Sequence, residues 1–441
     1  MCQSNSVQSV SGSVVSVHPG TDMASLNSSP RDDDSVVLVQ EDFCARILTL
    51  NRTRQLNALN FEMISRLLEF FFAYEEDANV KLLILKGKGR AFCAGGDVAA
   101  VVHDINEGRI SLSPLVFLSS NLMNVLSAYL SDTSELPPLC YIGNWRSGAH
   151  FFRKEFTLNY LMATYSKPQV SLLNGIVMGG GAGASVHGRF RVATENTVFA
   201  MPETALGLFP DVGASYYLSR LPGFFGEYVG LTGARLDGAE MLACGLATHF
   251  VPSTSLPLLE AALCKVDSSE FATVQAILDQ YSQHPALKEK SAYHRMDIID
   301  KCFSRRTVEG ILSALEEEAA KRADGWLSTT IQSLKKASPM SLKISLRSIR
   351  EGRLQGVGQC LVREYRMVSH VLRGEVSKDF REGCRAILLD KDRNPKWEPS
   401  KLELINDNMV DQYFSKLDDE EWEELKLPAR SNLPVTAIAK L

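Results

Sequence analysis

Two segments of this chain run from an apolar strand into glycines and then into small or apolar residues. One is residues 174–187, N-G-I-V-M-G-G-G-A-G-A-S-V-H; the other is residues 90–97, R-A-F-C-A-G-G-D, which follow the apolar run Val80 to Lys86. Glycines leave backbone N–H groups exposed because they have no side chain. At the start of a helix such groups bind an anion or a developing oxyanion. The alternative is that the glycines serve close helix packing or a tight turn. Strands that alternate with helices in this way predict an α/β fold.

Two carboxylates interrupt an apolar segment that follows the glycine run of residues 174–187. Residues 200–213 read A-M-P-E-T-A-L-G-L-F-P-D-V-G and place Glu203 and Asp211 among apolar neighbours. A carboxylate in a dry pocket is costly unless it is paired, hydrogen-bonded or protonated. Two neighbouring carboxylates also perturb each other's titration, which separates acid from base roles. A pair of solvated loop acids is the alternative interpretation.

These segments resemble the crotonase superfamily of acyl-CoA enzymes and, within it, the 3-hydroxyisobutyryl-CoA hydrolases. The resemblance covers residues 35–108 and 144–400, and its most specific motifs are Leu50–Leu59, Phe92–Asp97, Asn174–Gly183, Phe199–Gly213, Leu231–Leu236 and Asp390–Trp397. It implies a fold of stacked ββα turns with a helical C-terminal region. It also implies an oxyanion hole made by the N–H groups of Gly96 and Gly180, an active carboxylate at Glu203, and substrate contacts at Asp211 and Glu155.

The residue at position 183 bears on the reaction class. Hydratases of this superfamily carry a glutamate there and a second one at the position of Glu203, whereas this chain has Gly183. A thioester hydrolase needs two N–H donors for the carbonyl oxygen while water or a carboxylate attacks the carbon. The resemblance therefore implies hydrolysis of 3-hydroxyisobutyryl-CoA in valine catabolism. Hydration or isomerisation of an enoyl-CoA, and an inactive CoA-binding protein, are the alternatives. A glutamate introduced at Gly183 would restore the hydratase pair if there is room for it.

Composition excludes several other classes of function. The formal charge of −5 gives no basic field for nucleic acid, and the nine cysteines contain no C-x-x-C pair. The eight histidines show no metal-binding spacing. We therefore expect no metal and no cofactor beyond the CoA of the substrate. Cys93 is interpreted as a small buried filler rather than a nucleophile, and His187 as a packing histidine rather than a ligand.

The chain divides into four predicted regions. Residues 1–34 are polar and lack helical periodicity, which predicts a disordered tail. Residues 35–267 are predicted to form the α/β core, and residues 268–425 a helical region that covers the site. The predicted core elements are a hairpin over 35–51, a helix over 60–76, and strands over 80–86, 168–174 and 191–200. The predicted C-terminal helices include 307–322, 340–350 and 357–372.

An atypical insertion lies inside the predicted core. Residues 109–143 have no counterpart in the resemblance, and residues 110–130 carry no charged side chain. Length alone would make the latter a candidate membrane span, but Pro114 and the scattered Ser and Asn argue against one. We expect a surface excursion or a gene-model artefact.

The last region, residues 426–441, ends in a candidate targeting signal. Ala439-Lys440-Leu441 is a variant of the Ser-Lys-Leu peroxisomal address, which an import receptor would bind. The first 34 residues contain one arginine, Arg31, so they do not resemble an arginine-rich transit peptide. The prediction is therefore a peroxisomal protein, with the mitochondrion as the alternative. The sequence leaves the oligomeric state open, a homo-oligomer included.

Overall fold

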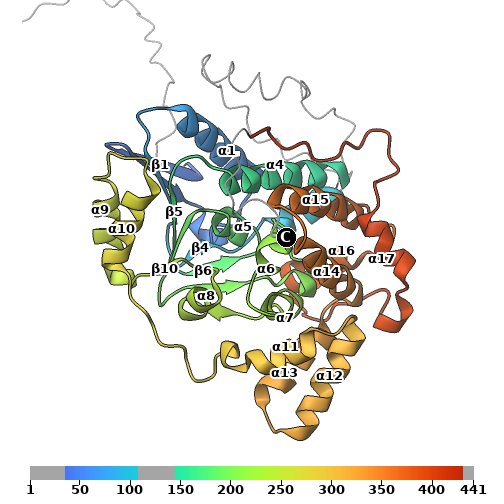
Figure 1. Ribbon diagram of the computed structural model, residues 1–441. Coiled ribbons are helices and arrows are strands. Elements are labelled where there is room, and N and C mark those ends of the chain that lie inside the picture. The colour runs from blue at the N-terminus through green and yellow to red at the C-terminus, as the bar shows by residue number, and fades with distance from the viewer. Residues whose placement is uncertain (1–34, 108–144, 431–441) are drawn as a thin grey trace, which may run out of the picture. The chain divides into compact units, whose positions relative to one another are not determined.

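The computed structural model describes residues 35–107 and 145–430 (Figure 1). The predicted tail over residues 1–34, the insertion over 109–143 and the terminal signal Ala439–Leu441 lie outside these residues.

A six-stranded sheet forms the first layer of the core. Its strand order is β1-β2-β3-β5-β7-β10, with β1 and β2 antiparallel and the other neighbours parallel. The parallel strands are almost continuously apolar and buried, as expected for strands covered on both faces. The strands are β1 Val37–Asp42, β2 Ala45–Leu50, β3 Leu82–Gly87, β5 Gln169–Leu173, β7 Phe190–Ala193 and β10 His249–Phe250.

A second, four-stranded sheet has the order β4-β6-β8-β9. Its strands are β4 Ala91–Cys93, β6 Ile176–Met178, β8 Val198–Ala200 and β9 Leu236–Asp237. Each of β4, β6 and β8 follows directly on a strand of the large sheet, so the chain repeats a unit of two strands and a helical segment. The predicted stacking of ββα turns is confirmed.

One predicted strand is wrong. Residues 191–200 form β7 and β8, which belong to different sheets and are separated by a turn over residues 194–197. Thr197 closes this turn, because its hydroxyl accepts the Thr194 N–H at 2.7 Å and donates to the Leu173 carbonyl at 2.6 Å. Side-chain hydrogen bonds of this kind compete with strand pairing.

Helices surround and follow the two sheets. The helix predicted over residues 60–76 is α1, Phe61–Glu76, and the Asn60 side chain caps it by accepting the Met63 N–H at 2.9 Å. The other helices of this part are α2 Val98–Glu107, α4 Trp145–Ala163, α5 Gly180–Val186, α6 Ala214–Leu218, α7 Phe225–Thr232, α8 Gly238–Cys244, α9 Leu256–Leu263 and α10 Phe271–Tyr281.

The region after residue 268 is helical in the described residues. The helices predicted over 307–322, 340–350 and 357–372 are confirmed, with small shifts of their ends, as α12 Val308–Lys321, α14 Pro339–Gly352 and α15 Val357–Arg373. The helices that were not predicted here include α11 Met296–Phe303, α13 Gly325–Lys336, α16 Asp379–Cys384 and α17 Asp407–Phe414. In Figure 1, α15 runs beside α4, and α14 lies against α6 and α7. The C-terminal helices thus contact the elements that surround the second glycine run.

None of the helices within residues 35–107 and 145–430 has both the length and the apolarity that crossing a membrane requires. The uncharged run over residues 110–130 lies outside the described residues.

Candidate active site

The first glycine turn follows β4 and is held by the segment before α1. Leu59 donates its N–H to the Gly95 carbonyl at 2.8 Å and accepts the Asp97 N–H at 2.8 Å. Gly95 has φ = +125°, a conformation that side chains other than glycine rarely adopt. Arg52 pairs with the Asp97 carboxylate at 3.0 Å, which anchors the far side of the turn. Gly96 is thereby fixed from both sides.

The second glycine turn follows β6 and leads into α5. Gly179 has φ = +47° and Gly180 is the first residue of the helix. The first N–H groups of a helix have no acceptor inside it. A Cβ placed on Gly180 would lie 2.8 Å from the Gly96 nitrogen, so only glycine fits where the two turns meet. The structure therefore brings together the two amides that the sequence suggested as an oxyanion hole.

Two carboxylates face these turns from different elements. A Cβ on Gly179 would lie 2.7 Å from Glu203 Oε1, and a Cβ on Gly180 would lie 2.4 Å from Glu155 Oε1. Glu203 opens the 3-10 helix Glu203–Leu206 after β8, whereas Glu155 comes from α4. Both side chains are buried, and Glu155 Oε1 and Glu203 Oε2 have no hydrogen-bond partner among the described residues.

Burial dominates the electrostatics of the three acids. It raises the pKa of Glu203 to about 8, with a further contribution from the Glu155 charge. It also raises the pKa of Glu155. The pKa of Asp211 is raised well above its usual range by burial and then by the charges of Glu155, Glu203 and Glu364. Perturbed carboxylates that face bare amides are typical of a catalytic site.

Asp211 lies in a strained turn. The next residue, Val212, has φ = +54°, which is rare for a β-branched side chain. The Val212 carbonyl lies 2.8 Å from Nε2 of His187. Glu364 of α15 accepts the Gly213 N–H at 2.6 Å. A segment far along the chain therefore helps to shape the turn that carries Asp211.

His187 and Cys93, which the sequence indicated as packing residues, both pack against other side chains. The His187 ring packs against Tyr217 and forms a hydrogen bond with the Val212 carbonyl. Burial lowers the pKa of His187 to about 4. Cys93 is fully buried, with a pKa raised to about 12 by burial, so its thiol is not ionised at neutral pH.

Gly183 has no room for a longer side chain. A Cβ there would lie 2.6 Å from the Val212 Cβ and 2.9 Å from Asn159 Nδ2. The hydratase glutamate cannot be restored at this position without displacing α4 or the Asp211 turn.

Sequence reasoning missed two buried polar residues, Asn159 and Glu364. Asn159 lies one helical turn after Glu155 on α4, and Glu364 lies on α15 among buried neighbours. In both helices a polar residue occupies the i, i+3, i+4, i+7 stripe of apolar residues, as in Val357, Cys360, Leu361 and Glu364. That interruption is the signal that could have found them.

The enoyl-CoA hydratase/isomerase family matches residues 45–414, which is most of the chain. The chain belongs to this family. The predicted resemblance to the crotonase superfamily is thereby confirmed.

Within the family the chain resembles the 3-hydroxyisobutyryl-CoA hydrolases. It is 68% identical to "3-hydroxyisobutyryl-CoA hydrolase 1" of Arabidopsis thaliana, over 92% of this chain and 98% of the relative. It is 44% identical to "3-hydroxyisobutyryl-CoA hydrolase-like protein 1, mitochondrial" of the same organism, over 92% and 93%. A crystal structure of a carnitinyl-CoA dehydratase from Mycobacterium thermoresistibile superposes with a TM-score of 0.74 at 31% identity, over 90% of this chain and 100% of that one. The crotonase fold is confirmed.

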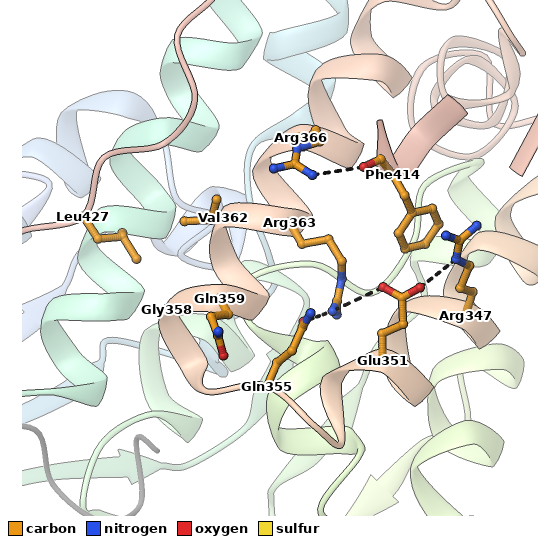
Figure 2. Close-up of a pocket in the computed structure, with 10 residues that line it drawn as sticks. All are labelled: Arg347, Glu351, Gln355, Gly358, Gln359, Val362, Arg363, Arg366, Phe414 and Leu427. Atoms are coloured by element: carbon orange, nitrogen blue, oxygen red, sulfur yellow. Dashed lines mark hydrogen bonds and ion pairs between the residues drawn. The ribbon is translucent and has the colours of Figure 1, made fainter. Parts of the chain in front are cut away.

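A pocket of about 510 Å³ lies away from the predicted site residues, between α14, α15 and α17 (Figure 2). Three arginines line it, but each has a partner. Arg347 pairs with Glu351 at 2.7 Å and also with Asp411, Arg363 lies 3.7 Å from Glu351, and Arg366 pairs with Glu424. The pocket therefore offers no uncompensated charge to an anion.

No group of three His, Cys, Asp or Glu side chains that could hold a metal ion occurs in the part of the chain that the structure describes.

Proposed function

We propose that this chain hydrolyses the thioester of 3-hydroxyisobutyryl-CoA to 3-hydroxyisobutyrate and CoA, a step of valine catabolism. The observation that carries the proposal is that the turns of Gly96 and Gly180 meet and that the buried carboxylate of Glu203 faces the adjoining Gly179. The high identity to a relative named for this activity supports the choice of substrate.

The chemistry follows from the positions of these groups. The thioester oxygen accepts hydrogen bonds from the Gly96 and Gly180 N–H groups, which stabilise the negative charge that develops on it. Glu203 then either takes a proton from the attacking water or attacks the carbonyl carbon itself, giving a mixed anhydride that water cleaves. Asp211, whose pKa is raised by burial, delivers a proton to the departing thiolate. Glu155 positions the acyl group. Water is the second reactant, and no cofactor is required beyond the CoA of the substrate.

Hydration of an enoyl-CoA is the second candidate, because two carboxylates face the glycine turns. Glu155 comes from α4 and not from α5, where Gly183 stands. Two carboxylates around one water are what addition across a double bond requires. The absence of room at Gly183 argues against the usual arrangement of that pair.

One pair of assays separates the alternatives. Purified protein is incubated with 3-hydroxyisobutyryl-CoA while free thiol is followed, and with crotonyl-CoA while the enoyl absorbance is followed. Release of thiol from the first substrate supports the hydrolase, and loss of the enoyl signal from the second supports the hydratase. Binding of CoA without either reaction would identify an inactive CoA-binding protein.

We propose the peroxisome as the location, through recognition of Ala439-Lys440-Leu441 by the import receptor. The mitochondrion is the alternative, and a relative at 44% identity carries that word in its name. A fluorescent fusion at the N-terminus should enter peroxisomes, and the same fusion lacking residues 439–441 should stay outside. Entry of the truncated chain, or mitochondrial targeting of the intact one, would contradict the proposal. The fold and the thioesterase activity should be unchanged by the truncation.

The oligomeric state is a separate question. Size-exclusion chromatography of the purified protein decides whether the chain is a homo-oligomer.

A further inference from the structure

Asn159 of α4 carries a fully buried side-chain amide. Its side chain is 0% exposed, and neither Nδ2 nor Oδ1 has a hydrogen-bond partner among the described residues. Burying an amide without hydrogen bonds costs on the order of 1–3 kcal/mol or more. An apolar side chain of the same size would avoid that cost, so stability alone does not explain an asparagine here.

The surroundings of Asn159 belong to the candidate active site. Asn159 lies four residues after Glu155 on α4, and side chains with this spacing share one face of a helix. On the facing helix α5, a Cβ at Gly183 would lie 2.9 Å from Asn159 Nδ2 and 2.6 Å from the Val212 Cβ. The amide therefore lies between Glu155 and the turn that carries Asp211.

The missing side chain at Gly183 makes room for this amide. Any residue larger than glycine would press on Asn159 Nδ2 and on Val212. The chain thus has a neutral amide from α4 beside the position where related hydratases carry a carboxylate. A carboxamide differs from a carboxylate because it can donate one hydrogen bond and accept another at the same time.

We propose that Asn159 recognises the hydroxyl group of the acyl chain and makes the site selective for hydroxylated short acyl-CoAs. This inference rests on the proposed function. The Oδ1 atom accepts the hydroxyl proton, and the Nδ2 group donates to the hydroxyl oxygen. An acyl group that ends in a methyl leaves both amide atoms unpaired and is bound less well, because a site built to hydrogen-bond a hydroxyl rejects the analogue that lacks it.

The test compares two substrates that differ in this hydroxyl alone. Thiol release is measured with 3-hydroxyisobutyryl-CoA and with isobutyryl-CoA, for the wild type and for Asn159→Leu. The wild type should prefer the hydroxylated substrate in kcat/KM. In Asn159→Leu this preference should fall by about 10- to 100-fold, with activity on isobutyryl-CoA kept or raised. The melting temperature of the variant should be equal or higher, because an unpaired amide is replaced by an apolar group.

Thr157→Val is the matched control. Thr157 is on the same helix but two residues from Glu155, and its hydroxyl donates to the Arg153 carbonyl at 2.8 Å. The control should leave the preference between the substrates unchanged. Asn159→Ala serves as a second variant should the leucine fail to fold.

Three outcomes would overturn the proposal: no preference in the wild type, an unchanged preference in the variants, or an equal loss on both substrates. If the wild type releases no thiol from either substrate, the proposed function fails instead. The dissociation constants of the two acyl-CoAs, measured by calorimetry for the wild type and Asn159→Leu, then test the hydroxyl contact by itself. The ratio of the two constants should again fall in the variant, and an unchanged ratio would contradict the contact.

Discussion

Glu364 of α15 holds the turn around Gly213, two residues after Asp211. Its carboxylate accepts the Gly213 N–H at 2.6 Å, the Ser215 N–H at 2.9 Å and the Ser215 hydroxyl at 2.5 Å. The side chain is fully buried, and burial raises its pKa. The helical C-terminal region therefore does more than cover the core, because it supplies the acceptor that shapes the Asp211 turn.

Glu364→Ala should lower both stability and turnover. Each buried donor left without an acceptor costs about 1–3 kcal/mol, and a shift of Asp211 by an ångström can reduce the rate by about 10²-fold. Urea unfolding and steady-state thiol release measure the two effects. Glu364→Gln, which keeps one acceptor oxygen, should lie between the alanine variant and the wild type.

Glu375→Ala is the control for that variant, because Glu375 is exposed and pairs with Arg373 at the surface. Such pairs contribute about 0–1 kcal/mol. If Glu364→Ala behaves like this surface variant in both assays, Glu364 does not position the turn.

Glu203→Gln should abolish turnover while CoA binding remains. The amide keeps the shape of the side chain but can neither take a proton from water nor attack the carbonyl, so kcat should fall by about three orders of magnitude or more. Assays of thiol release measure turnover, and calorimetry with CoA measures binding. Glu76→Gln, at an exposed position of α1, should match the wild type. Near-normal turnover of Glu203→Gln would remove Glu203 from the mechanism.

A single turnover in oxygen-18 water separates the two roles of Glu203. A mixed anhydride that water cleaves at the Glu203 carbonyl carbon carries a protein oxygen into the first product and labels the side chain in return, whereas a general base does neither. The label is read by mass spectrometry of the product and of the peptide that contains Glu203.

Much of the fold could be predicted because its signals are local. The helix over residues 60–76, the apolar runs of the parallel strands and the glycines after β4 and β6 each depend on residues close together in the chain, and each was predicted from the sequence. The boundary between β7 and β8 was not, because the hydroxyl of Thr197 closes the turn by bonding Leu173 on another strand.

The candidate site could be predicted only in part. Gly96, Gly180, Glu203 and Asp211 carry motifs, and the structure brings the two glycines and Glu203 together. Asn159 and Glu364 act through neighbours that are distant in the sequence, at Gly183 and Gly213. A polar residue in an apolar stripe shows that something must satisfy it, but the sequence does not show which segment lies opposite.

The pH dependence of activity and of stability should run in opposite directions. Burial raises the pKa of Glu203 to about 8, and Glu203 must be ionised to act as base or nucleophile. The kcat/KM for thiol release should therefore rise with pH through about 8. Between the usual value of 4.5 and about 8, the folded carboxyl keeps a proton that the unfolded chain has lost. The folded state then binds more protons, so the free energy of unfolding should fall as pH rises across that window.

Urea unfolding at several pH values, for the wild type and Glu203→Gln, isolates the contribution of this group. The variant cannot titrate at position 203, so its stability should depend less steeply on pH. Identical slopes for the two proteins would show that the pKa of Glu203 is not raised in the folded state.

Gly183→Ala should be destabilising, because the added Cβ meets both Val212 and Asn159 at less than 3.0 Å. Overpacking of this kind costs about 1–3 kcal/mol. Gly325→Ala is the matched control, since a Cβ there has nothing within 4 Å, and the exchange in a helix should stabilise by up to about 1 kcal/mol. Gly183→Glu should be worse than the alanine variant and should gain no hydration of crotonyl-CoA, because its carboxylate cannot reach the site without moving α4. A stable, folded Gly183→Glu protein that hydrates crotonyl-CoA would show that the contacts around Asn159 yield, and that glycine at this position is what separates this chain from a hydratase.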